Sequence, residues 1–325
     1  MTPQFRWGIL GAGAIARKFA SDLKRLPDAE CYAVGSRSQE KADAFALEFG
    51  MTVAYGSYEA LMADTNVDAI YVATPHPFHK EHSIACLLAG KPVLCEKPFA
   101  INTSEVQDMI DTAHAANVFL MEAMWTRFLP VNLKVCQWIA EGKIGEPRFL
   151  MADFGFRSGI NPQGRLFNPE LGGGALLDVG IYPISYASMI FNAQPTHIYA
   201  SGELGNTGVD YQTSLLFAYN NGANAMLRTA IRVTTEQRAR IEGTEGAIEI
   251  PDFWHATRAS LFMNGKLEET IEGESGYHFE AAEVMRCVRE GKTESDRMPL
   301  KESLAIMQTM DEIRKQIGLS YPMEA

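Results

Sequence analysis

The chain has 325 residues, more than one ordinary hydrophobic core accommodates, so its length predicts two domains. Hydrophobic residues make up 46% and charged residues 21%, the usual balance of a soluble globular protein. The net charge of −11 argues against a nucleic acid or an anionic membrane as partner, because both require a basic surface. We find no run approaching the roughly 20 apolar residues of a membrane span.

The five cysteines are odd in number and include no C-x-x-C pair. This pattern favours reduced thiols over a disulfide framework or a zinc site. The first six residues lack a basic stretch followed by a long apolar one, so we expect no signal peptide. These features predict a cytoplasmic protein.

The first third of the chain alternates short apolar strands with amphipathic helices. We expect strands at residues 5–10, 31–36, 69–74, 93–96 and 118–121, and helices at 14–26, 39–49, 79–89 and 103–116. This alternation predicts an α/β fold, a Rossmann-type doubly wound parallel sheet with helices on both faces. We assign this domain to residues 1–123.

The pattern changes near residue 122. Expected strands at 149–156, 197–203, 211–219, 223–231, 238–242 and 247–250 follow one another with turns between them. One long helix at 175–191 interrupts them, and helices at 279–290 and 300–317 close the chain. We therefore assign residues 124–325 to an α+β domain with an open, mostly antiparallel sheet. An apolar sheet face needs cover, and a second copy supplies it most simply, so we expect a homodimer.

A glycine turn follows the first strand and opens the first helix. Residues 11–16 fit the G-x-G-x-x-(G/A) pattern, in which the backbone approaches a pyrophosphate at a helix N-terminus. The candidate cofactor contacts are Gly11, Gly13, Ala14, Ile15 and Ala16. The alternative is a glycine turn that merely packs a helix on a sheet, but its position at the start of βαβ units favours a dinucleotide site.

The end of the second strand discriminates between NAD and NADP. An NAD site usually has Asp or Glu there, whereas this strand ends in Ser36 and Arg37. Arg37 can pair with a 2′-phosphate, and Ser36 offers a hydroxyl. The sequence therefore favours NADP over NAD, although an exposed loop arginine is the plain alternative.

Two further segments carry candidate chemistry. Glu96-Lys97-Pro98 ends a parallel strand, where a lysine can stabilise a developing alkoxide and make a neighbouring phenol more acidic. Three glycines at 172–174 precede a helix on which Asp178 and Tyr182 are four residues apart and share a face. A carboxylate and a phenol in this arrangement suit proton transfer, but a first-turn acid and a packed tyrosine would give the same pattern.

These motifs occur in the order seen in a known family. Residues 11–16, Ala73-Thr74-Pro75-His76-Pro77-Phe78-His79, Glu96-Lys97-Pro98 and residues 173–182 together resemble the glucose–fructose oxidoreductase, inositol dehydrogenase and rhizopine-catabolism (Gfo/Idh/MocA) family. The resemblance covers nearly the whole chain. The stretch from Met121 to Phe128 resembles the branch of the trans-dihydrobenzenediol and NADP-dependent D-xylose dehydrogenases.

The resemblance implies an active site in a cleft between the domains, with Lys97 and Tyr182 as the catalytic pair. It implies that Asp178 positions the substrate or the lysine, and that the Lys97–Pro98 peptide is cis. It also implies that the cofactor site is lined by Thr74, Pro75, His76, His79 and Glu96.

The aromatic and arginine residues near these motifs are weaker candidates. Trp125 and Phe154 are expected to form an apolar wall for a substrate ring, and Arg127 to hold substrate oxygens. Arg165 is a candidate for the nicotinamide amide. His76 and His79 are three residues apart but have no third ligand nearby, so we expect no metal site.

The predicted function is an NADP-dependent dehydrogenase that moves a hydride to or from a sugar, polyol or trans-diol. Two alternatives remain open: an NADP-binding sensor without catalysis, and a glycosidase that uses a redox cofactor transiently. The first would be expected to lack part of the Lys97, Asp178 and Tyr182 set. The second would form no net NADPH.

Overall fold

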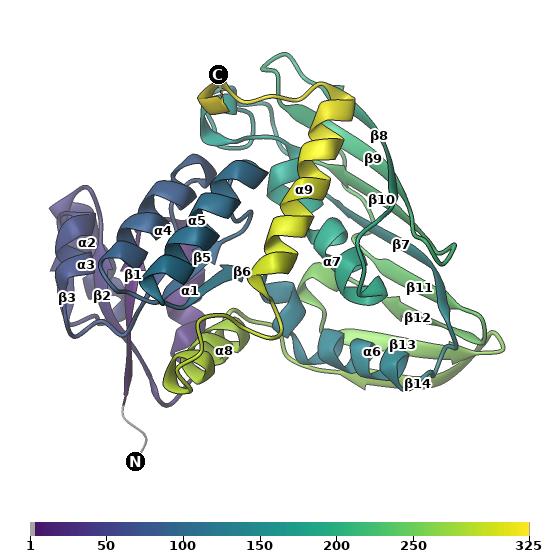
Figure 1. Ribbon diagram of the computed structural model, residues 1–325, viewed down its shortest axis with the longest axis horizontal. Helices are drawn as coiled ribbons and strands as arrows, with labels where there is room; N and C mark the ends of the chain where they lie inside the picture. The colour runs from purple at the N-terminus through teal and green to yellow at the C-terminus, as the bar shows by residue number, and fades with distance from the viewer. Residues whose placement is uncertain (1–3, 325) are drawn as a thin grey trace. The chain divides into compact units, whose positions relative to one another are not determined.

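The computed structural model describes residues 4–324, which divide into two compact units. The first unit takes the chain up to Trp125 and again Gly276–Leu304. The second takes Thr126–Ser275 and the chain from Ala305 onward (Figure 1). We describe each unit by itself.

The first unit is built on a six-stranded parallel sheet in the order β3-β2-β1-β4-β5-β6. Its strands are β1 (Phe5–Leu10), β2 (Ala29–Gly35), β3 (Val53–Tyr55), β4 (Ala69–Val72), β5 (Val93–Glu96) and β6 (Leu120–Ala123). Its helices are α1 (Ala14–Leu23), α2 (Gln39–Phe49), α3 (Tyr58–Ala63), α4 (His79–Leu88), α5 (Thr103–Ala116) and α8 (His278–Arg289). The predicted doubly wound α/β fold is confirmed.

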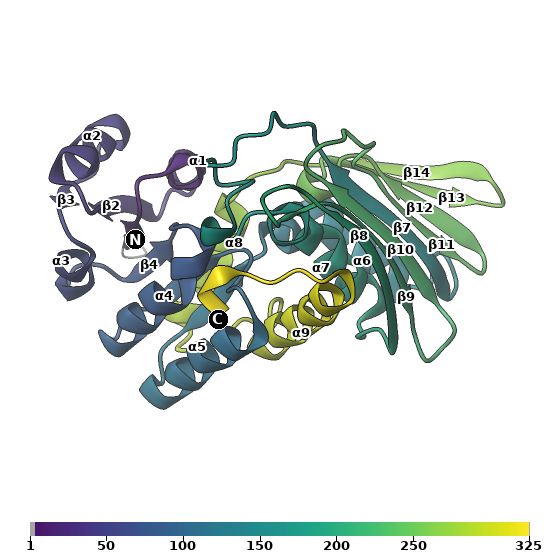
Figure 2. The ribbon, with the colours of Figure 1, turned by 90° about the horizontal axis from the view of Figure 1, so that it is seen from above.

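Strand β4 shows why these strands form. All four of its residues are buried, as expected for a continuous apolar run covered on both faces of a parallel sheet. The adjacent helices α4 and α5 cover one face of the sheet, and α1 lies on the other (Figure 2).

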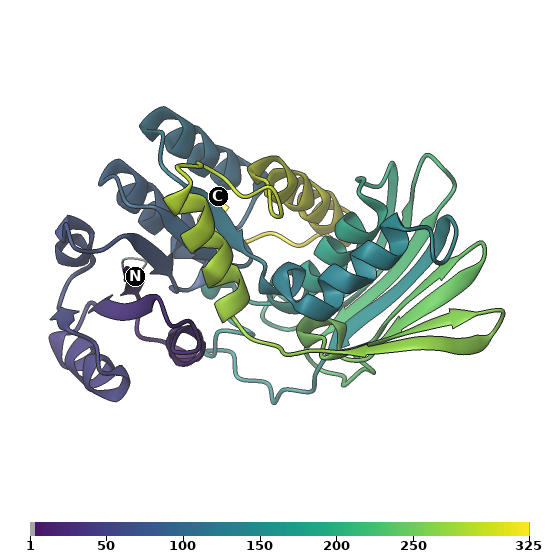
Figure 3. The ribbon, with the colours of Figure 1, turned by 90° about the horizontal axis from the view of Figure 1, so that it is seen from below.

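Helix α8 returns to the first unit from far along the sequence. It packs on α1, as the yellow-green and purple helices in Figure 3 show, and the N–H of Tyr277 donates to the Asp22 carboxylate at 2.8 Å. The division into 1–123 and 124–325 was therefore wrong for residues 276–304. The helix itself was predicted, but nothing in its local pattern shows which sheet it covers.

The second unit contains an eight-stranded sheet in the order β14-β13-β12-β11-β7-β10-β9-β8. Its strands are β7 (Pro147–Gly155), β8 (His197–Leu204), β9 (Asp210–Ala218), β10 (Asn224–Ala230), β11 (Ala239–Gly243), β12 (Gly246–Ile250), β13 (Arg258–Met263) and β14 (Lys266–Glu272). Among the pairings that the structure describes in this second sheet, only β7–β10 is parallel. The predicted, mostly antiparallel sheet is thus confirmed.

Helices cover one face of this sheet. They are α6 (Pro130–Ala140), α7 (Ile181–Phe191) and most of α9 (Leu300–Ile317), and Figure 2 shows them on the same side of the strands. Successive side chains along a strand point to opposite faces of the sheet. In β10, Ala225 and Leu227 are buried, whereas Met226 is 48% exposed. The other face of the sheet is therefore open and partly apolar.

One segment differs from the expectation that no run of residues is apolar enough to span a membrane. Residues Pro169–Phe191 are long and apolar enough to cross a membrane by length and composition. In the structure, 89% of the most apolar window is buried, so its apolar character is explained by the core of the second unit.

Candidate active site

The glycine turn of the first unit has the geometry of a phosphate loop. Gly11 has φ +107°, and a Cβ there would lie 2.9 Å from the carbonyl oxygen of Ala73, so the turn requires glycine. At Gly13, by contrast, a Cβ would meet no atom within 4 Å. Only Ala16 of the remaining loop positions is fully buried, against the sheet. The loop is thus closed on its strand side and open where a ligand would approach.

Helix α1 begins at this opening without a side-chain cap. Its N-cap residue is Gly13, whereas α2, α3 and α5 are capped by Ser38, Ser57 and Asn102. Uncapped N–H groups and the positive end of the helix dipole are what a pyrophosphate requires. Gly13 and Ala14 are exposed and Ile15 is half-buried, so the residues fit a dinucleotide cofactor.

The end of β2 lies beside the glycine turn, because the N–H of Gly11 donates to the carbonyl of Gly35 at 2.9 Å. Ser36 is buried and Arg37 exposed. Burial raises the pKa of the Tyr58 phenol, and the neighbouring Arg37 guanidinium counteracts that rise. The strand tip therefore presents a cation and no carboxylate.

His79 connects two loops at the same edge of the sheet. Its Nε2 lies 2.8 Å from the carbonyl oxygen of Thr74, and its Nδ1 lies 2.8 Å from that of Pro98. The ring is fully buried, and burial lowers its pKa to about 4. His79 thus lies behind the loops and fixes their positions. Thr74 and His76 are also buried, and Pro75 is half-buried.

Lys97 follows β5 at the carboxyl edge of the parallel sheet. The Lys97–Pro98 peptide bond is cis, which confirms the expectation from the family resemblance. The backbone N–H of Lys97 donates to Glu96 Oε2 at 3.2 Å, and the Tyr71 hydroxyl donates to Glu96 Oε1. Glu96 is buried, so its carboxylate lies among core groups of the first unit and supports the backbone at Lys97.

The second unit presents the glycine turn that precedes Asp178. Gly172 and Gly174 have φ of +65° and +115°. A Cβ at Gly173 would lie within 2.9 Å of three carbonyl oxygens, those of Arg165, Leu166 and Asn168. The turn therefore packs too closely for any side chain, and it leads directly into the helix.

The expected long helix begins as a π-helix over Leu176–Gly180 and continues as α7. Such π segments are frequent at functional sites. Asp178 lies in the π segment, and its Oδ1 accepts from Arg165 Nη1 at 2.8 Å. Tyr182 lies in the first turn of α7 and is 5% exposed. Arg165 is thereby placed on Asp178, a contact that the sequence did not predict.

Two aromatic side chains, Phe154 and Trp254, lie beside the Tyr182 ring. The centroid of Phe154 lies 5.3 Å from that of Tyr182, and Trp254 stacks on Phe154 at 4.6 Å. Trp254 also meets Tyr182 edge-to-face at 6.1 Å, and its Nε1 donates to Gln237 Oε1 at 3.0 Å. Trp254 was not predicted as a site residue from the sequence, although it lies in the aromatic run Phe253-Trp254-His255.

Trp125 and Arg127 lie in the 3-10 turn Trp125–Phe128, where the chain passes from the first unit to the second. Trp125 is 4% exposed and stacks on Tyr277 at 4.5 Å within the first unit. Arg127 is buried in the second. Within residues 4–324, His, Cys, Asp and Glu side chains form no group of three or more that could hold a metal ion.

Comparison with known proteins agrees with this geometry. Residues 5–124 match the family described as "Oxidoreductase family, NAD-binding Rossmann fold", and residues 132–249 match the GFO/IDH/MocA C-terminal domain. Trans-1,2-dihydrobenzene-1,2-diol dehydrogenase of Xenopus tropicalis is 40% identical over 98% of this chain and 99% of its own length. The Homo sapiens protein of that name is 36% identical, with 98% of each chain covered.

Solved structures share the fold. A 3-ketoreductase from Actinomadura kijaniata in complex with NADP and TDP-benzene has a TM-score of 0.86 and 25% identity, covering 97% of this chain and 98% of its own. An aldose-aldose oxidoreductase from Caulobacter crescentus complexed with glycerol has a TM-score of 0.88 and 24% identity, covering 96% and 97%.

The fold, the glycine turn at residues 11–16 of the first unit, and Asp178 and Tyr182 of the second define the class of protein. It is a two-domain oxidoreductase whose Rossmann unit binds a nicotinamide dinucleotide. More specifically, the chain belongs to the GFO/IDH/MocA oxidoreductase family, which confirms the resemblance seen in its motifs.

Proposed function

We propose that this protein is an NADP-dependent dehydrogenase that oxidises a hydroxyl-bearing carbon of a sugar, polyol or trans-diol. The observation that carries the proposal is the placement of Tyr182 one turn from Asp178, with its ring against Phe154 and Trp254. A proton-transferring phenol beside an aromatic wall suits a hydroxylated ring as substrate. The relatives named above, trans-1,2-dihydrobenzene-1,2-diol dehydrogenases, point to the same class.

In this proposal each chemical role belongs to a named side chain. A bound nicotinamide dinucleotide would supply the hydride acceptor for this chemistry. Tyr182 takes the proton of the substrate hydroxyl, and Lys97 is the second member of the catalytic pair that the family resemblance implies. Asp178, held by Arg165, orients the substrate hydroxyl. Ser36, Arg37, Thr74, Pro75 and His76 line the cofactor site, with Trp125 and Arg127 beside the substrate.

Tyr182→Phe tests the catalytic assignment. A panel of D-xylose, myo-inositol and trans-dihydrobenzenediol is offered with NADP⁺, and NADPH absorbance is followed. We expect kcat to fall by about 10²-fold or more without change in NADPH affinity. Tyr186→Phe is the matched control, since Tyr186 is one turn further along α7 and donates to Asn132 at 3.4 Å. Near-normal turnover of Tyr182→Phe would remove this residue from the mechanism.

The preference for NADP rests on Arg37 at the tip of β2. A hydrogen bond to a charged group is worth about 1.5–3 kcal/mol, so Arg37→Ala should raise the KM for NADP⁺ about 10- to 100-fold. The KM for NAD⁺ should hardly change. Lys41→Ala removes an exposed charge four residues away and serves as control. Equal effects of Arg37→Ala on both cofactors would refute the preference.

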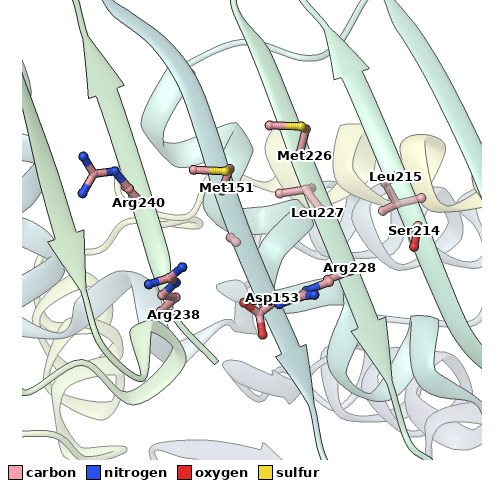
Figure 4. A pocket seen from close by; sticks show the side chains of 10 residues that line it. Met151, Asp153, Ser214, Leu215, Met226, Leu227, Arg228, Arg238 and Arg240 are labelled. Carbon is pink, nitrogen blue, oxygen red and sulfur yellow. Dashed lines mark ion pairs between the residues drawn. The ribbon is translucent and has the colours of Figure 1, made fainter. Parts of the chain in front are cut away.

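We further propose a homodimer formed through the open face of the second unit's sheet. A hollow on this face is lined by Met151, Met226 and charged side chains, as Figure 4 shows. Arg228 lies 3.6 Å from Asp153, and Arg240 pairs with Glu242 at 2.8 Å, so the face carries both signs. A surface that carries both charges and exposed apolar side chains can pair with a second copy of itself across a two-fold axis.

Light scattering at micromolar concentration tests this interface. Met226→Asp should shift the protein to a monomer, because it places a charge on the apolar part of the face. Leu88→Asp is the control, since Leu88 is 73% exposed on α4 of the first unit. A monomeric wild-type protein would contradict the proposal.

We also propose that the protein functions in the cytoplasm. All five cysteines have free thiols, and burial raises the pKa of Cys31 and Cys86 to about 12. Free thiols that form no disulfide suit a reducing compartment. Fractionation of cells that produce the tagged protein provides the test, and recovery outside the cytoplasmic fraction would contradict it.

A further inference from the structure

The glycine turn before the catalytic helix is held from two sides by side chains that the mechanism does not use. The carbonyl oxygen of Gly173 accepts from the Tyr321 hydroxyl at 2.8 Å. Two residues past the turn, the N–H of Leu176 donates to Asp210 Oδ2 at 2.8 Å. Both contacts lie within the second unit and join segments far apart in sequence.

Asp210 is the first residue of β9 and is fully buried. Its Oδ2 also accepts from the Thr213 hydroxyl at 3.0 Å, which fixes the carboxylate on its own strand. Its Oδ1 lies against the turn, because a Cβ built at Gly174 would be 2.2 Å away. Movement of the turn toward β9 is therefore blocked, and movement away breaks the bond to Leu176.

Tyr321 reaches the turn from the segment that follows α9. It is 3% exposed, and the Arg314 guanidinium lies 4.9 Å from the centre of its ring. Glu324 pairs with Arg314 and accepts from the backbone N–H of Tyr321 at 3.0 Å. The hydroxyl is thus fixed in place by α9.

We propose that Asp210 and Tyr321 are positioning residues for Asp178 and Tyr182. The inference rests on the proposed function, since it concerns the same site. Leu176 opens the π segment, and Asp178 follows it by two residues. The N–H of Asp178 lies 3.4 Å from the carbonyl oxygen of Gly174, a long hydrogen bond between the start of the helix and the turn that precedes it. The hydrogen bonds from Asp210 and Tyr321 come from outside the helix. They fix the position of the helix start, and with it the positions of Asp178 and Tyr182.

The test compares Tyr321→Phe with Tyr219→Phe. Tyr321→Phe removes only the hydroxyl that bonds Gly173. Tyr219→Phe removes a buried hydroxyl of the same unit that makes no hydrogen bond within residues 4–324. In addition, Asp210→Ala removes the carboxylate, whereas Asp210→Asn keeps an acceptor for Leu176. The readouts are kcat and KM on the substrate panel, and amide hydrogen exchange of residues 172–182 and of β10.

We expect Tyr321→Phe to lower kcat by about 10- to 100-fold, the effect of a small misplacement, with an unchanged KM for NADP⁺. Exchange at residues 172–182 should become about tenfold faster, as for one lost buried hydrogen bond, while β10 exchanges at the wild-type rate. Asp210→Ala should behave likewise, and Asp210→Asn should restore most of kcat.

The proposal is overturned if Tyr321→Phe matches Tyr219→Phe in either readout, or if β10 exchange accelerates equally, which would indicate general destabilisation. Wild-type protein that oxidises none of the panel would instead show that the proposed function has failed. In that case the exchange rates alone decide whether Asp210 and Tyr321 hold the start of the helix.

Discussion

Replacing Asp210 with asparagine should change how the stability of the second unit depends on pH. Burial raises the pKa of Asp210 from its ordinary 3.8 to about 6, against the opposing hydrogen bonds from Thr213 and Leu176. The folded protein therefore retains a proton that the unfolded chain has lost. The stabilisation that this bound proton contributes is complete below pH 3.8 and is lost as the pH rises through 6. Two pKa units correspond to about 3 kcal/mol in full, and to about 2 kcal/mol between pH 4.5 and 8.

The measurement is the free energy of unfolding of the wild type minus that of Asp210→Asn. Other titrating groups cancel in this difference, and the neighbouring Tyr321 phenol stays neutral because burial raises its pKa well above the ordinary value. Hydrogen exchange of β9 and β10 in increasing urea reports on the second unit. The difference should fall by about 2 kcal/mol from pH 4.5 to 8. A difference constant within about 0.5 kcal/mol would refute the reasoning.

Substitutions at four other positions have defined outcomes. Gly13→Ala should leave the melting temperature unchanged, since its Cβ meets no atom, but raise the Kd for NADPH about tenfold or more, whereas Gly11→Ala should destabilise by about 1–3 kcal/mol. Calorimetry and cofactor titration compare the two, and equal destabilisation would contradict the loop geometry. His79→Ala should lower the urea midpoint at pH 7 by the equivalent of about 2 kcal/mol or more. The neutral ring has one N–H for the two carbonyls that flank it, so the replacement removes one buried donor and leaves a cavity in place of the ring. Trp254→Ala should raise the KM for ring substrates about tenfold at constant KM for NADP⁺, and a Phe replacement should restore most of the loss; unaltered KM would exclude Trp254 from the site.

The sequence was most informative where a segment's pattern is determined by its immediate surroundings. Strands buried on both faces, such as β4, appear as continuous apolar runs, and the glycine turns mark positions that exclude side chains. The short elements β3 and α3, of three and six residues, were missed because so few positions show no periodicity. Helix α6 and strands β13 and β14 were missed as well.

The site was predictable only as far as its motifs extend. Lys97, Asp178 and Tyr182 belong to recognisable stretches, but Trp254, Asp210 and Tyr321 reach this region through long-range packing. The sequence separation between Tyr321 and Gly173 is 148 residues, and no local pattern encodes such a contact. Single-chain patterns predict elements well, and partners between elements poorly.

The return of α8 to the first unit determines when this unit can fold during synthesis and where the chain can be truncated. When the first 125 residues have left a ribosome, the surface of α1 still lacks the helix that covers it, and Asp22 lacks its backbone donor at Tyr277. The Rossmann unit is therefore finished only after nearly all of the polypeptide has been synthesised. A gene truncated after Trp125 should yield an aggregating fragment, whereas supplying residues 276–304 on a short linker should rescue it.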